Sequence, residues 1–180
     1  MPLTGGDDAS PTGGAPAEAE HGAPARIAGA VAIGGGLLSL AIALVVVVSV
    51  TLRSPLVGAA GVPGDFELVQ MATAVSIFAF LPLTQARRAN IVVDTFTLRL
   101  SARVRARIDA FWDVVYAAVA ALIATSLIGG ARDASASGTN TMVLALPISP
   151  AIAACAMLAA FLAAVAAWTG LRVWRAGGAA

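Results

Sequence analysis

Long uncharged apolar stretches alternate with short polar ones along the sequence. The apolar stretches cover residues 27–52, 68–86 and 114–131, and a fourth lies within residues 134–171. A helix needs about 20 mostly apolar residues to cross a bilayer, so each stretch is long enough to span a membrane. The pattern therefore predicts an all-α integral membrane protein with four transmembrane helices.

The ends of the helices follow from polar and proline residues. Ser101 is a suitable N-cap for a third helix that starts near Ala102, before its membrane span. Proline favours the first helical turn, so we expect Pro147 and Pro150 to lie just before the fourth span. We place the four spans at about residues 27–52, 66–86, 108–131 and 151–171.

These spans define one membrane domain, residues 26–175, with a tail at each end. We expect the four helices to form a closed bundle, because hydrocarbon requires every backbone group to be hydrogen-bonded internally. Residues 1–25 are rich in Ala, Pro, Gly and Glu without an apolar period, and this composition predicts a disordered tail. The acidic start and the long first apolar run argue against a cleaved signal peptide. Residues 176–180 form a short C-terminal tail.

Arginine supplies all eleven positive charges, and its distribution predicts the orientation of the chain. Nine arginines lie before the first span, between the second and third spans, or after the fourth; the other two are Arg53 and Arg132. Because cytoplasmic loops are enriched in arginine, both termini and the middle loop are expected in the cytoplasm. Trp168 and Trp174 flank Arg172 and are typical of an aromatic belt at that interface.

Composition excludes several classes of function. The chain is 59% hydrophobic and 12% charged, and a net charge of +1 gives no bulk attraction to nucleic acid. With one cysteine, Cys155, and one histidine, His21, a thiol pair, a cysteine metal cluster and ligation of haem by two histidines are excluded. No charged residue lies near the middle of a span, and no base is available to activate a nucleophile. We expect neither a cofactor nor an enzyme.

Small residues recur at every fourth position in the first and fourth spans. This spacing allows helix backbones to approach closely. The residues are Ala28, Ala32 and Gly36 in the first span, and Ala156, Ala160, Ala164, Ala159, Ala163 and Ala167 in the fourth. We interpret residues 34–36, three consecutive glycines, as a helix-packing site and not as a phosphate loop. The fourth span has more small surface than one neighbouring helix can cover, which leaves some for another contact.

The middle loop, residues 85–101, contains a segment at 91–100 that is too apolar for a free loop. We expect this amphipathic segment to lie in the cytoplasmic interface or on a protein surface. The helix after it carries Arg105, Asp109 and Asp113 at four-residue spacing. This stripe indicates either ion pairs at the headgroup level or a docking contact of Asp113, within the chain or with a partner. The candidate interface or ion-pair residues are Arg87, Arg88, Asp94, Arg99, Arg105, Asp109 and Asp113.

Several short motifs, taken in order and spacing, resemble the small membrane subunit of tripartite ATP-independent periplasmic (TRAP) transporters, the DctQ type. They are Pro-Gly-Asp-Phe-Glu-Leu at 63–68, Phe-Leu-Pro-Leu-Thr-Gln at 80–85, Ile-Val-Val-Asp at 91–94 with Leu-Arg-Leu at 98–100, residues 103–109, and Gly-Thr-Asn-Thr-Met-Val-Leu at 138–144 with Leu-Pro at 146–147. The resemblance covers about residues 62–170. Asn90 stands where the family often has His, and Asn140 where it often has Glu, so the resemblance identifies the family and leaves the subfamily and its contacts open.

The resemblance implies a multi-pass protein of the bacterial inner membrane that pairs with a large membrane subunit. The large subunit carries the substrate and sodium sites, and the small one braces it. A separate periplasmic protein binds the substrate, usually an organic anion, and delivers it. By this resemblance, Asp65, Glu67, Thr139 and Asn140 are candidate contacts in the periplasmic loops. The implied partners are the large subunit, the periplasmic substrate-binding protein and the lipid bilayer, with no nucleic acid.

Two alternatives remain from the residues themselves. One is a small four-helix membrane enzyme whose cytoplasmic arginines bind an anionic cosubstrate, and the missing base, thiol pair and metal set argue against it. The other is a scaffold of a different membrane complex. The sequence separates the scaffold from a transporter subunit only through the family resemblance.

Overall fold

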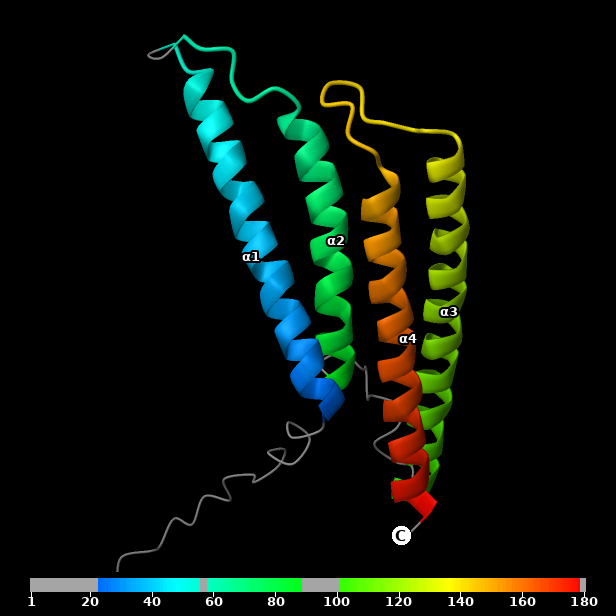
Figure 1. Ribbon diagram of the computed structural model, residues 1–180. Coiled ribbons are helices and arrows are strands. Elements are labelled where there is room, and N and C mark those ends of the chain that lie inside the picture. Colours follow the sequence, from blue (N-terminus) through cyan, green and yellow to red (C-terminus); the bar gives the residue numbers. More distant parts are fainter. Residues whose placement is uncertain (1–22, 56–57, 89–100, 179–180) are drawn as a thin grey trace, which may run out of the picture.

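The computed structural model describes residues 23–55, 58–88 and 101–178 of the 180-residue chain. These residues form four helices, α1 (Ala23–Leu52), α2 (Asp65–Ala86), α3 (Ala102–Ala136) and α4 (Ser149–Gly178) (Figure 1). All four are long and apolar enough to cross a membrane, which confirms the predicted all-α membrane fold. Most of the expected N-terminal tail, residues 1–22, and the expected amphipathic segment, 91–100, lie outside the described residues.

Local sequence explains where the helices begin and end. Ser101 occupies the N-cap position of α3, but its carbonyl accepts from the Arg105 N–H at 3.1 Å and its side chain forms no cap bond. Pro150 lies in the first turn of α4. Gly64, with a left-handed φ of 70°, precedes α2. Helix α3 continues past the uncharged stretch, so that Arg132 lies within its last turns.

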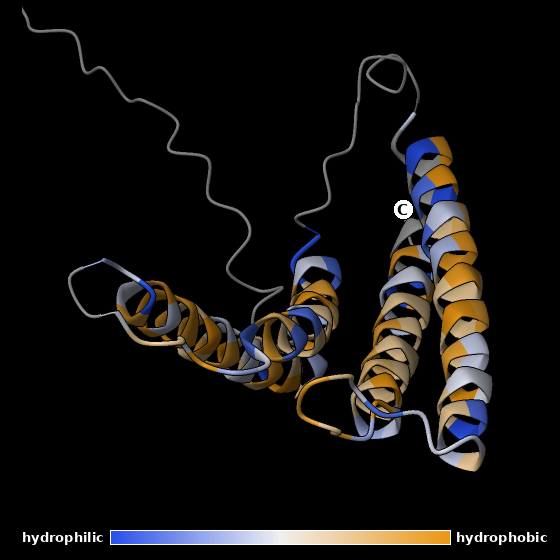
Figure 2. Cartoon of the chain, turned by 90° about the horizontal axis from the view of Figure 1, so that it is seen from above, coloured by the Kyte–Doolittle hydropathy of each residue, from blue (hydrophilic) through white to orange (hydrophobic). Residues whose placement is uncertain are grey.

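The helices are arranged in an open row in the order α1, α2, α4, α3. Helix α1 packs on α2, α2 on α4, and α4 on α3 (Figures 1 and 2). The expectation of a closed bundle is therefore wrong. Each helix satisfies its own backbone hydrogen bonds, so in lipid a helix does not need protein neighbours on two sides. The row consists of two helical hairpins, α1–α2 and α3–α4.

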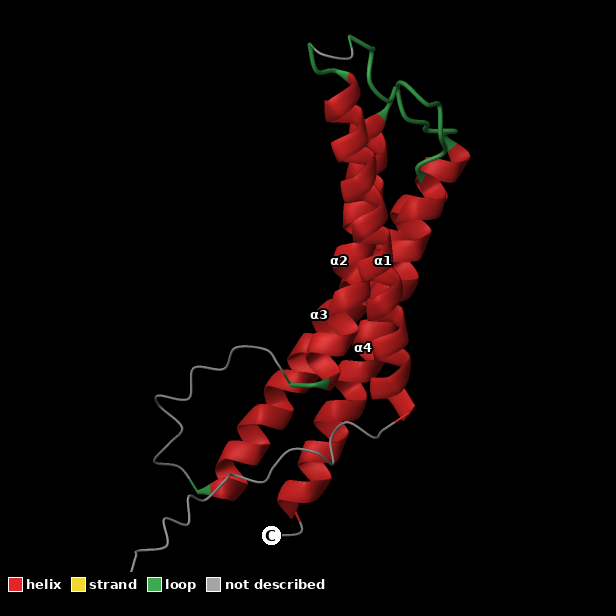
Figure 3. Cartoon of the chain, turned by 90° about the vertical axis from the view of Figure 1, so that its left-hand side faces the viewer, coloured by secondary structure: helices red, strands yellow, loops and turns green. Residues whose placement is uncertain are grey.

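The two ends of the row differ in what they carry. Residues 53–64 and 137–148 connect the helices at one end, which we name the loop end. The start of α1 and the end of α4 lie at the opposite, terminal end (Figure 1). In Figure 3, α3 and α4 extend further than α1 and α2 at the terminal end. Hydrophilic positions gather toward the helix ends and loops, and apolar positions run along the helices between them (Figure 2).

Helix α1 approaches α2 closely at Gly35. Ala28, Ala32 and Gly35 are buried, and a Cβ added at Gly35 would lie 2.7 Å from the Ala79 Cβ. A Cβ at Gly36 would meet nothing within 4 Å, so the predicted stripe through Gly36 is wrong in its last member. At 3.6 residues per turn, Gly35 lies within about 20° of Ala28 around the helix axis. Gly36 lies about 80° away from Ala28 and therefore points to another side of the helix.

Helix α4 has the most extensive buried face of the four helices, and it packs mainly against α3 and also against α2. Of the two predicted stripes of small residues, Ala156 and Ala159 are buried, whereas Ala160, Ala164 and Ala167 are exposed. The buried positions on α4 are Cys155, Ala156, Ala159, Leu162, Val165, Ala166, Thr169 and Gly170. Part of the small-residue surface on α4 is therefore exposed in the described chain.

The contact at Gly35 predicts opposite effects for two neighbouring glycines. Gly35→Ala should destabilise the protein by about 1–3 kcal/mol, because the new methyl group collides with α2 at a rigid Cβ atom. Gly34→Ala, in open space, should stabilise it by up to about 1 kcal/mol through helix propensity. Thermal unfolding in detergent micelles, followed by circular dichroism, measures both. Equal midpoints for the two variants would contradict the described α1–α2 contact.

Candidate functional site

The charged and buried polar groups that make contacts are concentrated at the two ends of α2. Buried polar residues in the described chain are Ser49, Ser76, Gln85 and Thr169. Within the described residues, no group of three His, Cys, Asp or Glu side chains is placed to hold a metal ion. The polar groups described below form contacts between helices and loops.

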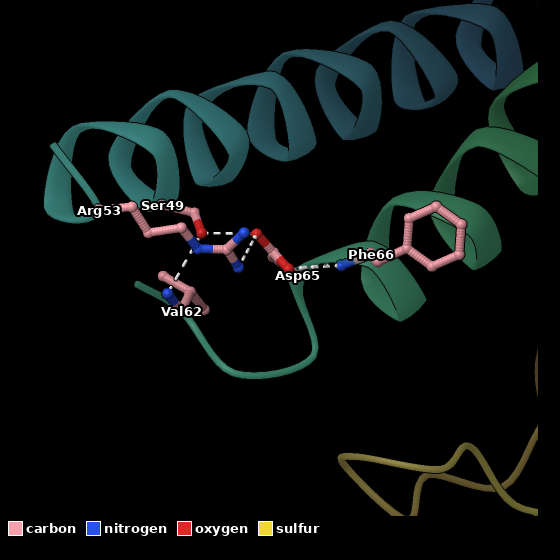
Figure 4. A network of polar contacts seen from close by, with 5 residues as sticks. All are labelled: Ser49, Arg53, Val62, Asp65 and Phe66. Atoms are coloured by element: carbon pink, nitrogen blue, oxygen red, sulfur yellow. Dashed lines mark hydrogen bonds and ion pairs between the residues drawn. The ribbon is translucent and has the colours of Figure 1, made fainter. Parts of the chain in front are cut away.

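Asp65 joins the end of α1 to the start of α2 (Figure 4). Its Oδ2 accepts hydrogen bonds from Ser49 Oγ at 2.5 Å and from Arg53 Nη2 at 2.9 Å, and its Oδ1 accepts from the Phe66 N–H at 2.9 Å. The Ser49 hydroxyl in turn accepts from the Val62 N–H at 3.2 Å. Both carboxylate oxygens of Asp65 are thus occupied. Because their donors include Ser49 of α1, the cluster joins the two helices of the first hairpin at the loop end.

The α1–α2 connection passes close to the Arg53 side chain. Gly61 has a left-handed φ of 79°, and a side chain at this position would collide with Arg53. Glycine thus allows both the turn and the close approach that keeps Arg53 beside Asp65. The guanidinium is half exposed, so the ion pair itself contributes little to stability. The buried Ser49 hydroxyl gives the cluster its directional hydrogen bonds.

Glu67 joins α2 to the loop between α3 and α4, and we name this contact the Glu67 clamp. Its two carboxylate oxygens accept from the backbone N–H groups of Val143 at 2.7 Å and Leu144 at 3.0 Å. Leu144 also packs so closely on Gly64 that a side chain at that glycine would collide with it. A carboxylate that binds two N–H groups forms charge-assisted bonds, which are stronger than neutral ones. The clamp therefore links the two hairpins at the loop end.

The loop that Glu67 binds has its own hydrogen bonds. The Thr141 N–H donates to the Leu146 carbonyl at 2.9 Å, and the Thr141 hydroxyl accepts from the Leu146 N–H at 3.0 Å. Asn140 and Pro147 form an isolated antiparallel bridge. Ala145 has a left-handed φ of 51°, which is uncommon for a residue other than glycine. The loop thus presents its N–H groups to Glu67 as a small folded hairpin.

A second link, the Asp113 clamp, lies at the other end of α2. Gln85 Nε2 donates to Asp113 Oδ1 of α3 at 3.0 Å and to Thr169 Oγ1 of α4 at 3.3 Å. Arg88 forms an ion pair with Asp113 Oδ2. Gln85 is only 3% exposed, so its amide depends on these partners for hydrogen bonding. The clamp connects α2 with both helices of the second hairpin.

The structure therefore places the predicted site residues in different surroundings. Asp65 and Glu67 are engaged within the chain, and so is Asp113, whose docking contact is with α2. Thr139 and Asn140 are exposed in the α3–α4 loop, and Arg87 is exposed at the end of α2. Asp109 and Arg105 are half-buried on α3. Asp94 and Arg99 lie outside the described residues.

Some members of these clusters are not evident from the sequence. The N–H groups of Val143 and Leu144 belong to the backbone, and side-chain identity does not reveal them. Ser49 and Thr169 are hydroxyl residues with apolar neighbours in the sequence of apolar helices, a pattern typical of bonds between helices. That pattern identifies them as hydrogen-bonding residues but does not identify their partners.

A comparison with protein families gives one match. The family model described as "Tripartite ATP-independent periplasmic transporters, DctQ component" matches residues 42–176, well over half of the chain. The match contains Asp65, Glu67, Gln85, Arg88 and Asp113. No curated protein and no solved structure gives a significant match.

The Glu67 clamp predicts a local effect on the α3–α4 loop. Glu67→Gln replaces one acceptor oxygen with an N–H donor, so one of the two amides loses its partner. Hydrogen–deuterium exchange of the peptide that contains residues 141–146 should become about tenfold faster, the effect of losing roughly 1.4 kcal/mol. Asp133→Asn is the matched control, because Asp133 is an exposed carboxylate near the same end. Identical exchange in wild type and Glu67→Gln would show that the clamp does not hold the loop.

Proposed function

The chain belongs to the DctQ component family of tripartite ATP-independent periplasmic transporters, and from this premise we propose that it is the subunit that braces the large membrane subunit of such a transporter. Association with a large permease and with a periplasmic binding protein is a general property of the family. The chain is thus a small transporter subunit and not an enzyme.

The open row of helices is the main observation that supports a role beside a larger membrane protein. In the most apolar 18-residue stretch of α1 only 11% of the residues are buried by the rest of the chain, as in α3, compared with 33% in α4. Large exposed apolar side chains extend along α1, among them Leu37, Leu40 and Leu44. A closed bundle would cover such faces itself, whereas an open row offers them to lipid and to a second membrane protein.

The two clamps support a bracing role. They link the α1–α2 hairpin to the α3–α4 hairpin at both ends of α2, through Glu67 and Asp113. A row of helices that is linked at both ends of α2 resists rotation of one hairpin against the other. Such a row suits the fixed part of a transporter whose moving part lies in another chain. The charge-free central stretches of the spans agree with ion and substrate sites in the large subunit.

We further propose that the terminal end faces the cytoplasm and the loop end the periplasm, in the bacterial inner membrane. Arginine is concentrated at the terminal end, in keeping with the positive-inside rule. The Arg172 guanidinium lies 4.6 Å from the centroid of the Trp168 ring, a cation–π contact typical of the membrane interface. Thr139 and Asn140 would then face the periplasm, where a substrate-binding protein could contact them.

The transported substrate and the coupling ion are proposed from the family alone. We propose an organic anion, delivered by a periplasmic binding protein and taken up with sodium. Both would bind to the large subunit.

Co-purification tests the bracing role. A tagged full-length chain, extracted from its native membranes in a mild detergent, should recover a many-span membrane protein in one-to-one stoichiometry. Leu40→Arg, on the exposed face of α1, should lower the recovery at least tenfold if that face binds the partner. Arg175→Gln, near the end of α4, is the control for a change of charge and should leave recovery unchanged. Recovery of the chain only as a homo-oligomer would contradict the proposal.

Single-cysteine labelling tests the orientation. In a Cys155→Ser background, a cysteine at exposed Thr139 should react in intact spheroplasts with a membrane-impermeant maleimide. A cysteine at exposed Ser101 should react only after the membrane is permeabilised. The reverse pattern would place the termini in the periplasm.

A further inference from the structure

An apolar groove separates the end of α3 from the start of α4. It has a volume of about 510 Å³. Its polar lining residues, Arg132, Ser135 and Ser149, come from the loop end of the two helices. Ile128, Met157 and Ala160 line it further from that end. The groove therefore has a charged mouth and an apolar interior, the polarity of a membrane lipid.

We propose that this groove binds one phospholipid, with an acyl chain between α3 and α4 and the headgroup phosphate on Arg132. The proposal requires only that α3 and α4 lie in a bilayer, and it is independent of transport. It concerns a surface that neither clamp uses.

The length of the groove suits one leaflet. From Ser149 to Ala160, α4 rises about 16 Å at 1.5 Å per residue. Half of the hydrocarbon core of a bilayer is about 15 Å thick. The groove thus reaches from the interface to near the bilayer centre, which is the depth that one acyl chain occupies. Small side chains on α4, Ala153, Ala156 and Ala160, leave the space for it.

The charge at the mouth matches a phosphate. Arg132 is exposed and, within the described chain, its side chain forms neither an ion pair nor a hydrogen bond. The first turn of α4, which begins beside it at Ser149, contains no acidic residue. The positive end of that helix dipole and the guanidinium therefore act on the same region, and both favour an anion. Asp133, the next residue along α3, is not part of the lining.

Native mass spectrometry of the full-length protein, titrated with phosphatidylglycerol, tests the proposal. Wild type should retain one phosphatidylglycerol per chain and should bind it more tightly than diacylglycerol with the same acyl chains. Arg132→Gln should weaken phosphatidylglycerol binding about tenfold and remove the preference for the phosphate, whereas Arg132→Lys should keep most of it. Both substitutions replace an exposed side chain, so a folding defect is not expected to obscure the result.

A second pair of variants tests the position of the acyl chain. Ala160→Phe fills the groove and should abolish the one-to-one binding. Ala164→Phe places the same ring on an exposed part of α4 outside the groove and should leave binding intact. Equal lipid occupancy in all variants, or no preference for phosphate in wild type, would overturn the proposal. So would a photo-crosslinker at Met157 that, in the assembled complex, captures a helix of the large subunit and no lipid.

Discussion

The structure depends on the two polar links that α2 makes at its ends. In hydrocarbon, apolar surfaces of helices gain little by leaving lipid for one another, so directional contacts decide how hairpins are placed. Glu67 and Gln85 are separated by nearly the whole of α2, and each reaches the second hairpin. Between them, among the described residues, the packing of α2 on α4 is the main contact that joins the two hairpins. Helix α2 is therefore the helix through which the two hairpins are held together.

This arrangement explains why an open row can be a stable scaffold. The Asp65 cluster closes the first hairpin, and the close contact at Gly35 brings α1 onto α2. Helix α4 contributes the largest buried face, against α2 and α3. The remaining apolar surface faces outward along the row, where lipid or a larger membrane protein can cover it. The groove beside Arg132 belongs to this outward surface, and a bound lipid there would extend the scaffold into the bilayer.

The sequence predicts the helices well because charge-free length is a direct consequence of bilayer thickness. It also singles out Asp113 as a residue of either an ion pair or a docking contact, since a carboxylate near apolar surroundings needs a partner. Helix packing is harder to predict from the sequence. The expected stripe of small residues ended at Gly36, one residue away from the contact at Gly35. The closed bundle failed because a uniform apolar surface does not show which faces meet protein and which meet lipid. The Glu67 clamp could not be predicted, because its partners are backbone N–H groups of a folded loop.

The distance between the two hairpins tests the central claim most directly. Spin labels at exposed Leu40 on α1 and Leu122 on α3, in a Cys155→Ser background, report it by pulsed electron–electron double resonance in nanodiscs. The account predicts one narrow distance distribution in the otherwise unaltered chain and a clearly broader one when Glu67→Gln and Asp113→Asn are combined. Asp109→Asn, which changes a carboxylate one turn away from Asp113, should leave the distribution narrow. An unchanged narrow distribution in the combined variant would contradict the claim that the two clamps fix the hairpins.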